Sequence, residues 1–110
     1  MLLFTYGTLL LPDVMQETVG FYNKPLKSVF VKGFKIKIIR KVIGKNPDYH
    51  LMFAIKTGND NDIIPGFLVE CSAIQLRRLD KFEGSAYKRE SVEVFTRDMQ
   101  CIDAVMYMKK

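Results

Sequence analysis

The chain has 110 residues, of which 48% are hydrophobic, so it is too apolar for a disordered protein and long enough for one core. We therefore expect a single domain over residues 1–110. The net charge of +5 is not accompanied by a basic cluster in a nucleic-acid-binding motif, which argues against nucleic acid as a partner. No apolar run reaches the roughly 20 residues that cross a membrane, and the apolar N-terminus lacks the features of a signal peptide. These features predict a cytoplasmic protein without membrane contact.

In chain order, the first prediction is a short buried strand over residues 2–6 that ends at Gly7. Pro12 suits the first turn of a short helix, which we expect to run to about Val19 and to stop at Gly20. The segment between this strand and this helix is a turn in which backbone N–H groups can face a ligand, because N–H groups near a helix N-terminus bind carboxylates and phosphates well.

Three further strands are expected in the middle of the chain. Residues 29–40 alternate between apolar and mostly basic side chains, which is typical of a half-buried strand, and Gly33 is where we expect it to bend. A second strand covers about 49–57. The run of Gly, Asn and Asp at 58–62 is the clearest loop, and another strand follows over residues 64–71.

The strongest local signal is a helix over residues 73–83. Ser72 and Gln75 have the spacing of a capping box at its start, and Gly84 is a typical stop. Two last strands, 88–97 and 101–108, are joined by a turn at residues 98–99. The whole pattern predicts an α+β domain built on a small, mostly antiparallel β-barrel of about six strands with two short flanking helices.

Glu83 is the most informative residue, because it continues the apolar stripe of the predicted helix. Leu76, Leu79 and Phe82 share one face at about 100° per residue, and Glu83 lies roughly 20° from Leu76. Two interpretations follow. A frayed last turn would let the carboxylate reach water, whereas a desolvated carboxylate would have the raised pKa that suits general acid–base catalysis.

Other candidates for metal or nucleophilic chemistry are few. His50 is the only histidine, so a multi-histidine metal site is excluded and we predict no metal. Cys71 and Cys101 have neither a redox nor a zinc spacing, and their apolar surroundings predict small buried side chains. Tyr87 and Arg89 follow Glu83 closely in the sequence. One interpretation is that they orient Glu83 or the substrate. The other is that Tyr87 only packs at a strand edge and Arg89 is only a surface charge.

Two motifs stand out when they are taken together. The first is Tyr6-Gly7-Thr8-Leu9 near the N-terminus, and the second is Leu79-Asp80-Lys81-Phe82-Glu83-Gly84, followed by Tyr87 and Arg89. In this order they resemble the gamma-glutamylcyclotransferase-like superfamily, especially its branch of gamma-glutamylamine cyclotransferases and avirulence-induced-gene-like proteins. Gly33 and Gly66 also stand where the family has glycines. The resemblance covers nearly the whole chain and implies a small β-barrel with flanking helices.

The resemblance implies an enzyme that needs no cofactor. Its small-molecule substrate would be a γ-glutamyl amide, which cyclises to 5-oxoproline and releases an amine or amino acid. Glu83 would be the catalytic acid–base, and the substrate-binding residues would be Tyr6, Gly7, Thr8, Leu9, Tyr87 and Arg89. We expect a monomer or weak dimer. The alternative is a non-catalytic small-molecule-binding or interaction module on the same barrel.

The resemblance also suggests a preference among substrates. The expected pocket rim is apolar over residues 9–11, all leucines, which disfavours the second carboxylate of glutathione. We therefore expect a γ-glutamyl group on an uncharged or amine-terminated leaving group to be preferred, unless a cation such as Arg89 pairs with that carboxylate.

Overall fold

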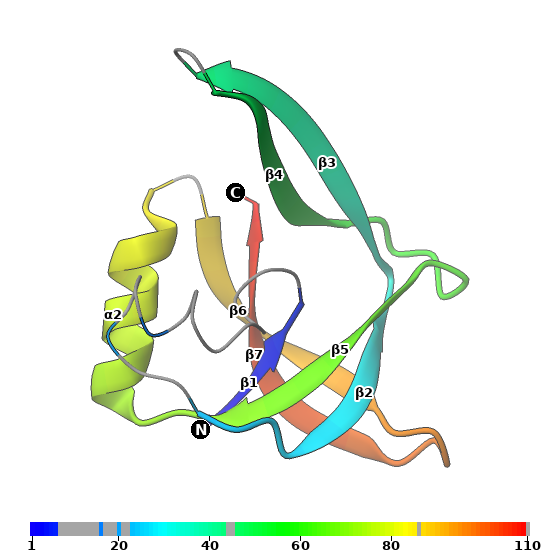
Figure 1. The fold of residues 1–110 in the computed structure, drawn as a ribbon. Coiled ribbons are helices and arrows are strands. Elements are labelled where there is room, and N and C mark those ends of the chain that lie inside the picture. The colour runs from blue at the N-terminus through cyan, green and yellow to red at the C-terminus, as the bar shows by residue number, and fades with distance from the viewer. Residues whose placement is uncertain (7–15, 17–19, 21–22, 44–45, 86, 110) are drawn as a thin grey trace.

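Five strands close into a barrel: β1 (Leu2–Thr5), β2 (Lys27–Lys32), β5 (Ile63–Glu70), β6 (Tyr87–Phe95) and β7 (Cys101–Lys109). The order around the barrel is β1-β5-β2-β6-β7, and Figure 1 shows it as the lower part of the molecule. This computed structural model describes residues 1–6, 16, 20, 23–43, 46–85 and 87–109. Within the barrel β1 and β7 are parallel and the other pairs are antiparallel, so the predicted mostly antiparallel α+β barrel is confirmed, with five strands where about six were expected.

The inside of the barrel is filled by alternate residues of its strands, as the period of two in a strand requires. On β5, for example, Ile64 and Leu68 are buried while Ile63 and Phe67 are exposed on the outer surface. The largest fully buried side chains of this core are those of Phe4, Val31, Ile64, Leu68, Val94, Met106 and Met108. Removing these apolar surfaces from water is the main stabilising contribution to the barrel.

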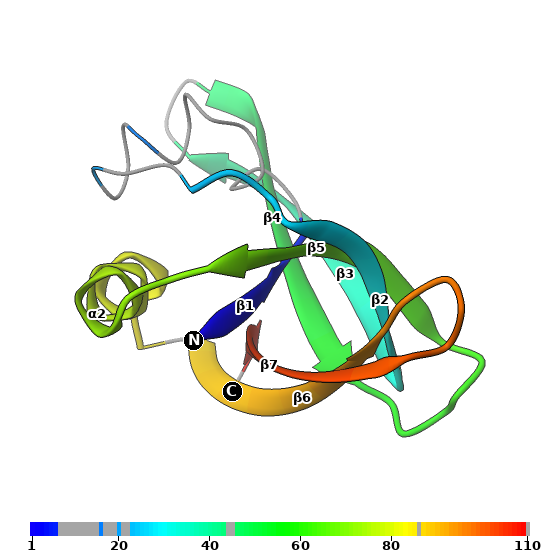
Figure 2. The same cartoon turned by 90° about the horizontal axis from the view of Figure 1, so that it is seen from below.

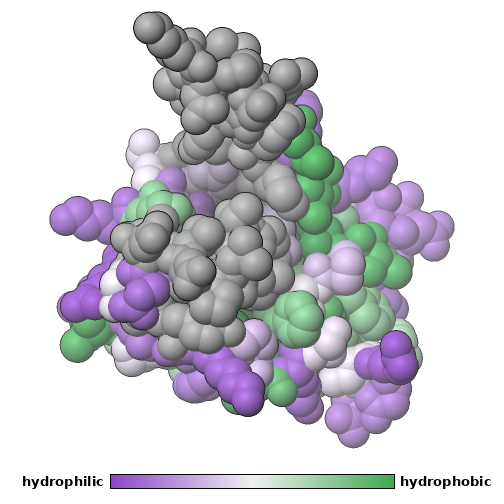
Figure 3. All heavy atoms as spheres, viewed as in Figure 1, coloured by the Kyte–Doolittle hydropathy of each residue, from purple (hydrophilic) through white to green (hydrophobic). Residues whose placement is uncertain are grey.

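A two-stranded ribbon, β3 (Phe34–Ile43) and β4 (Asn46–Lys56), forms a second sheet outside the barrel. The sequence predicted one bent strand over residues 29–40, and the structure instead has β2 and β3, separated by Gly33 at a φ of +84°. This left-handed conformation favours glycine and ends the pairing of β2. The ribbon therefore leaves the barrel at Gly33, and its residue Ile38 is 60% exposed. Figure 3 shows that hydrophobic residues form part of the described surface.

Helix α2 (Ala73–Glu83) packs against the outside of the barrel, as Figure 2 shows from below. The side chain of Ser72 accepts from the Gln75 amide, and the Gln75 side chain accepts from the Ser72 amide, so the predicted capping box is confirmed. Leu76 and Leu79 are buried, but Phe82 is 46% exposed. The prediction that Phe82 belongs to the buried stripe is therefore wrong, because the helix contacts the barrel through a narrower face.

The remaining sequence predictions have mixed outcomes. Cys71 is buried as expected, whereas Cys101 is exposed on β7, so the prediction for Cys101 is wrong. The helix predicted from Pro12 to Val19 lies outside the described residues, apart from Gln16. Among the described helices, none is long and apolar enough to cross a membrane.

Candidate active site

The C-terminal end of α2, the start of β6 and the end of β7 lie at the same end of the barrel (Figure 1). β1 also ends near this point and continues into Tyr6. The Tyr6 hydroxyl donates a hydrogen bond to the Tyr107 carbonyl oxygen at 3.0 Å and accepts one from the Ala54 amide at 2.9 Å. It thereby joins β7 to β4. Burial raises the pKa of Tyr6 to about 12, so this hydroxyl keeps its proton at neutral pH.

Glu83 is the last residue of α2 and is half-buried. The turn after it is closed by the Gly84 amide, which donates to the Asp80 carbonyl oxygen at 3.1 Å. Burial raises the pKa of Glu83 from 4.5 to about 7. Among the described residues none forms a hydrogen bond or ion pair with this carboxylate. Of the two interpretations open from the sequence, the structure favours the desolvated carboxylate over the frayed turn.

Electrostatic interactions link Glu83 to two tyrosines. Burial is the largest cause of the raised pKa of Tyr6 and of Tyr107, and the charge of Glu83 is a smaller cause that raises both. Tyr87 also makes a small contribution to the raised pKa of Tyr6. For Glu83 itself the cause is burial, because desolvation stabilises the protonated form of a carboxyl group.

The other predicted site residues divide into two groups. Arg89 lies on β6, and its Nη1 is 3.6 Å from Asp80 Oδ2 on α2, so its charge is directed at the helix. Gly7, Thr8 and Leu9, which were expected to form the substrate loop, lie outside the described residues. Of the predicted residues that the structure describes, Tyr6, Glu83 and Tyr87 therefore interact electrostatically, and Arg89 lies beside Asp80.

Two residues of this region, Asp80 and Tyr107, were missed as functional candidates. Tyr107 is buried on β7, and its hydroxyl lies 2.5 Å from Asp80 Oδ1 and 3.1 Å from the Leu76 carbonyl oxygen. Burial and the hydrogen bond to Asp80 raise the pKa of Tyr107 well above its ordinary value. In the sequence Asp80 stands out only as part of the motif at 79–84, and Tyr107 could be recognised only from the exact pairing of the last two strands.

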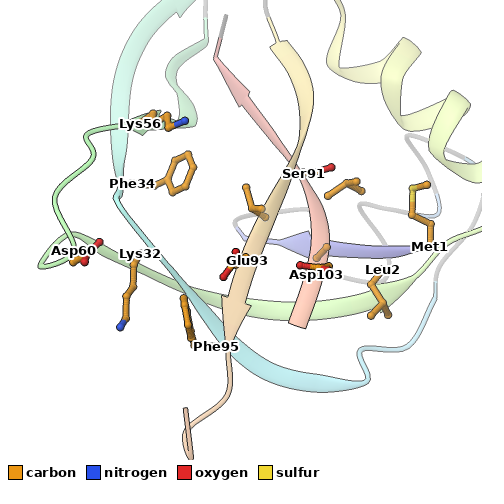
Figure 4. Close-up of a pocket in the computed structure, with 13 residues that line it drawn as sticks. Met1, Leu2, Lys32, Phe34, Lys56, Asp60, Ser91, Glu93, Phe95 and Asp103 are labelled. Carbon is orange, nitrogen blue, oxygen red and sulfur yellow. The ribbon is translucent and has the colours of Figure 1, made fainter. Parts of the chain in front are cut away.

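A cavity of about 820 Å³ opens elsewhere on the barrel, beside the first half of β7 and the second half of β6 (Figure 4). Its lining includes the oppositely charged residues Lys32, Lys56, Asp60, Glu93 and Asp103. None of the predicted site residues that the structure describes lines it. Within the described part of the chain, no group of three or more His, Cys, Asp or Glu side chains is arranged to hold a metal ion.

Comparison with known proteins supports the same family as the motifs. The family described as "Gamma-glutamyl cyclotransferase, AIG2-like" matches residues 3–110, and the chain therefore belongs to this family. A search of curated proteins gives no significant match.

Solved structures share the fold at low identity. A structure titled gamma-glutamyl cyclotransferase has 17% identity and a TM-score of 0.80, covering 100% of this chain and 66% of its own. An uncharacterised Homo sapiens protein has 19% identity and a TM-score of 0.80, and the match covers 99% of this chain and 66% of the human protein's chain. An Arabidopsis thaliana protein, At3g28950.1, has 19% identity and a TM-score of 0.68, covering 98% and 61%. The chain thus spans under two thirds of the length of these structures.

Proposed function

We propose that this protein is a γ-glutamyl cyclotransferase that converts a γ-glutamyl amide into 5-oxoproline and a free amine, with Glu83 as the catalytic acid–base. The observation that carries this proposal is the pKa of Glu83, raised to about 7 by burial at the end of α2. Such a carboxyl group exists in both protonation states near neutral pH, which is the condition for taking and returning a proton in one turnover. Family membership supplies the reaction class.

The proposed reaction is an intramolecular aminolysis. Glu83 takes a proton from the substrate's α-ammonium group, and the resulting amine attacks the γ-carbonyl carbon, which forms the N–C bond of a five-membered ring. The tetrahedral intermediate then breaks the original C–N bond. Glu83 returns its proton to the leaving nitrogen, which also gains the proton left on the ring nitrogen. The products are 5-oxoproline and an ammonium ion, so atoms and charge balance.

The enzyme's main task in this mechanism is to fold the substrate. Because nucleophile and electrophile belong to one molecule, holding the amine against the γ-carbonyl lowers the entropic barrier substantially. The backbone N–H groups of the Tyr6–Leu9 segment are the proposed donors to the substrate carboxylate and to the developing oxyanion. Tyr6 itself would form a wall of the pocket, since both of its described hydrogen bonds go to the backbone.

This proposal is tested by incubating the purified protein with γ-glutamyl alkylamines, γ-glutamyl dipeptides and glutathione, and measuring 5-oxoproline by mass spectrometry. We expect release from at least one class by the wild type and none above background by Glu83→Gln. Glu90→Gln is the matched control, because Glu90 is a carboxylate of β6 that pairs with Lys88 and, by the alternation of a strand, leaves the face opposite to that of Arg89. Release from no substrate class by a folded wild-type protein would contradict the proposal and favour a binding module.

A further inference from the structure

Three side chains from three different elements meet one turn before Glu83. Asp80 on α2 receives a hydrogen bond from the Tyr107 hydroxyl of β7 at 2.5 Å, and Arg89 of β6 lies 3.6 Å from the other oxygen of the same carboxylate. The Tyr107 hydroxyl also lies 3.1 Å from the Leu76 carbonyl oxygen, one turn further back in the helix. The last two turns of α2 are therefore attached to both β6 and β7.

The register of the sheet explains why these side chains meet. Arg89 and Tyr107 are direct partners in the antiparallel pairing of β6 and β7, so their side chains leave the same face of the sheet. Asp80 and Glu83 are three residues apart in α2 and therefore neighbours on the helix surface. Asp80 thus contacts the cross-strand pair, and Glu83 lies next to it at the end of the barrel.

We propose that Asp80 is a positioning residue that, through Tyr107 and Arg89, fixes the last turn of α2 and so holds Glu83 in its half-buried place. This inference rests on the proposed function, in which Glu83 moves the protons. Glu83 has no described side-chain partner, so its position depends on the helix turn that carries it. Terminal helix turns fray easily. A misplacement of about 1 Å in a catalytic group can reduce the rate about 100-fold.

The same arrangement controls the charge next to Glu83. Among the described residues, the charged or titratable groups beside Glu83 on its own helix are Asp80 and Lys81. Those at this end of the barrel are Tyr87, Lys88 and Arg89 on β6, Tyr107 and Lys109 on β7, and Tyr6 after β1. The guanidinium of Arg89 is paired with Asp80, which keeps this cation from pairing with Glu83. Without Asp80, the guanidinium would be available to the Glu83 carboxylate and would favour its charged form.

The test uses Asp80→Asn, which keeps the size and an acceptor for Tyr107 but loses the ion pair, and Tyr107→Phe, which loses both hydroxyl contacts. Glu90→Gln again serves as the control. The ¹³C carboxyl signal of Glu83, assigned by its absence in Glu83→Gln, is titrated by NMR in each protein. We expect the midpoint to fall by at least about half a pH unit in Asp80→Asn and Tyr107→Phe, because Glu83 becomes more exposed or gains a cation. It should stay unchanged in Glu90→Gln.

Steady-state kinetics add a second readout. We expect kcat to fall roughly 10- to 100-fold in both variants, with a much smaller change in KM, because binding groups remain while proton transfer is misaligned. Folded variants with lower melting temperatures but an unchanged Glu83 midpoint would overturn the proposal, since that is the result of a purely structural role. If Tyr107→Phe does not fold, Asp80→Asn decides. The titration needs no substrate, so its result stands even if the wild type shows no turnover.

Discussion

The Tyr6 hydroxyl accepts a hydrogen bond from the backbone amide of Ala54 at 2.9 Å, which connects the residue after β1 to the outer ribbon. Its own proton goes to the Tyr107 carbonyl oxygen at 3.0 Å. One phenol therefore bridges β4 and β7 at the end of the barrel where Glu83 lies. Tyr6, the first residue of the Tyr-Gly-Thr-Leu motif, therefore has a structural role. Gly7 remains the residue whose backbone we propose to approach the ligand.

Replacing Tyr6 by Phe should destabilise the protein by about 1–3 kcal/mol, because the Ala54 N–H and the Tyr107 carbonyl both lose a partner in a partly buried place. Chemical denaturation of Tyr6→Phe against wild type measures this. Ser91→Ala, at an exposed position of β6, is the control and should change stability little. A Tyr6→Phe protein as stable as wild type would show that water replaces the hydroxyl without cost.

Gly66 should tolerate no side chain. A Cβ at this position would lie 2.3 Å from the Thr5 carbonyl oxygen and 2.8 Å from the ring of Phe4, so backbone of β1 would have to move. Gly66→Ala should therefore lose several kcal/mol or fail to fold. Gly58→Ala is the comparison, because its Cβ meets nothing within 4 Å and only its φ of +72° is strained, at a cost of about 1 kcal/mol. Equal losses in the two variants would contradict the clash.

The raised pKa of Glu83 predicts a pH-dependent cost in stability. Its folded value of about 7 exceeds the unfolded value of 4.5, so between these values the folded protein holds the proton more tightly than the unfolded chain. The contribution of Glu83 to the free energy of unfolding therefore falls as the pH rises from about 4.5 to about 7 and is constant above that.

Urea unfolding of wild type and Glu83→Gln, near pH 4.5 and near pH 8, tests this sign. Gln resembles the protonated acid at every pH, so Glu83→Gln should gain stability relative to wild type at the higher pH. The same difference between the two proteins at both pH values would show that Glu83 is not desolvated in the folded state.

Substrate preference should follow the placement of Arg89. Its guanidinium faces Asp80, so it is less available to pair with the second carboxylate of glutathione. We expect kcat/KM for a γ-glutamyl alkylamine to exceed that for glutathione. A ratio below one would show that another cation serves that carboxylate, and it would leave the cyclotransferase chemistry itself intact.

The sequence predicted helix α2 almost to the residue because its signals are local. Ser72, Gln75 and Gly84 fix the two ends without help from the rest of the chain. The buried face was predicted too wide, because Phe82 follows the helical period and yet projects past the barrel at 46% exposure. Which part of an apolar stripe is buried depends on the angle at which the helix crosses the sheet. The periodicity of the sequence gives no information about this angle.

The contacts around Asp80 could not be predicted from the sequence, because they depend on the register between β6 and β7. A two-residue turn at 98–99, as expected from the sequence, would pair Arg89 with Met108. In the structure the Thr96 amide donates to the Gln100 carbonyl oxygen, and Met99 adopts a φ of +66°, so the loop has three residues. Arg89 then pairs with Tyr107 instead. A shift of one residue moves every side chain of a strand to the other face, so the sequence alone could not show that Tyr107 lies beside Arg89.

The sequence pattern also could not predict that the ribbon separates from the barrel. β3 begins with alternating apolar and basic residues and β2 has three consecutive apolar residues at 29–31, but both patterns are typical of strands, and only Gly33 marks the change of sheet. A glycine in a strand is equally compatible with a bend and with an ending. Whether the strand bends or ends at Gly33 depends on contacts between residues distant in sequence. One of them is the hydrogen bond that the Gly33 amide donates to the Asp62 carbonyl oxygen at 2.8 Å.

The most direct test of the central claim is the turnover of Glu83→Gln on a substrate that the wild type is shown to cyclise. Gln is nearly isosteric with Glu and cannot exchange a proton at neutral pH, so the fold should persist while kcat falls by at least about 10²–10⁴-fold. In the wild type the pH profile of kcat/KM should inflect near the Glu83 pKa of about 7. A Glu83→Gln protein with wild-type kcat would contradict the role given to Glu83.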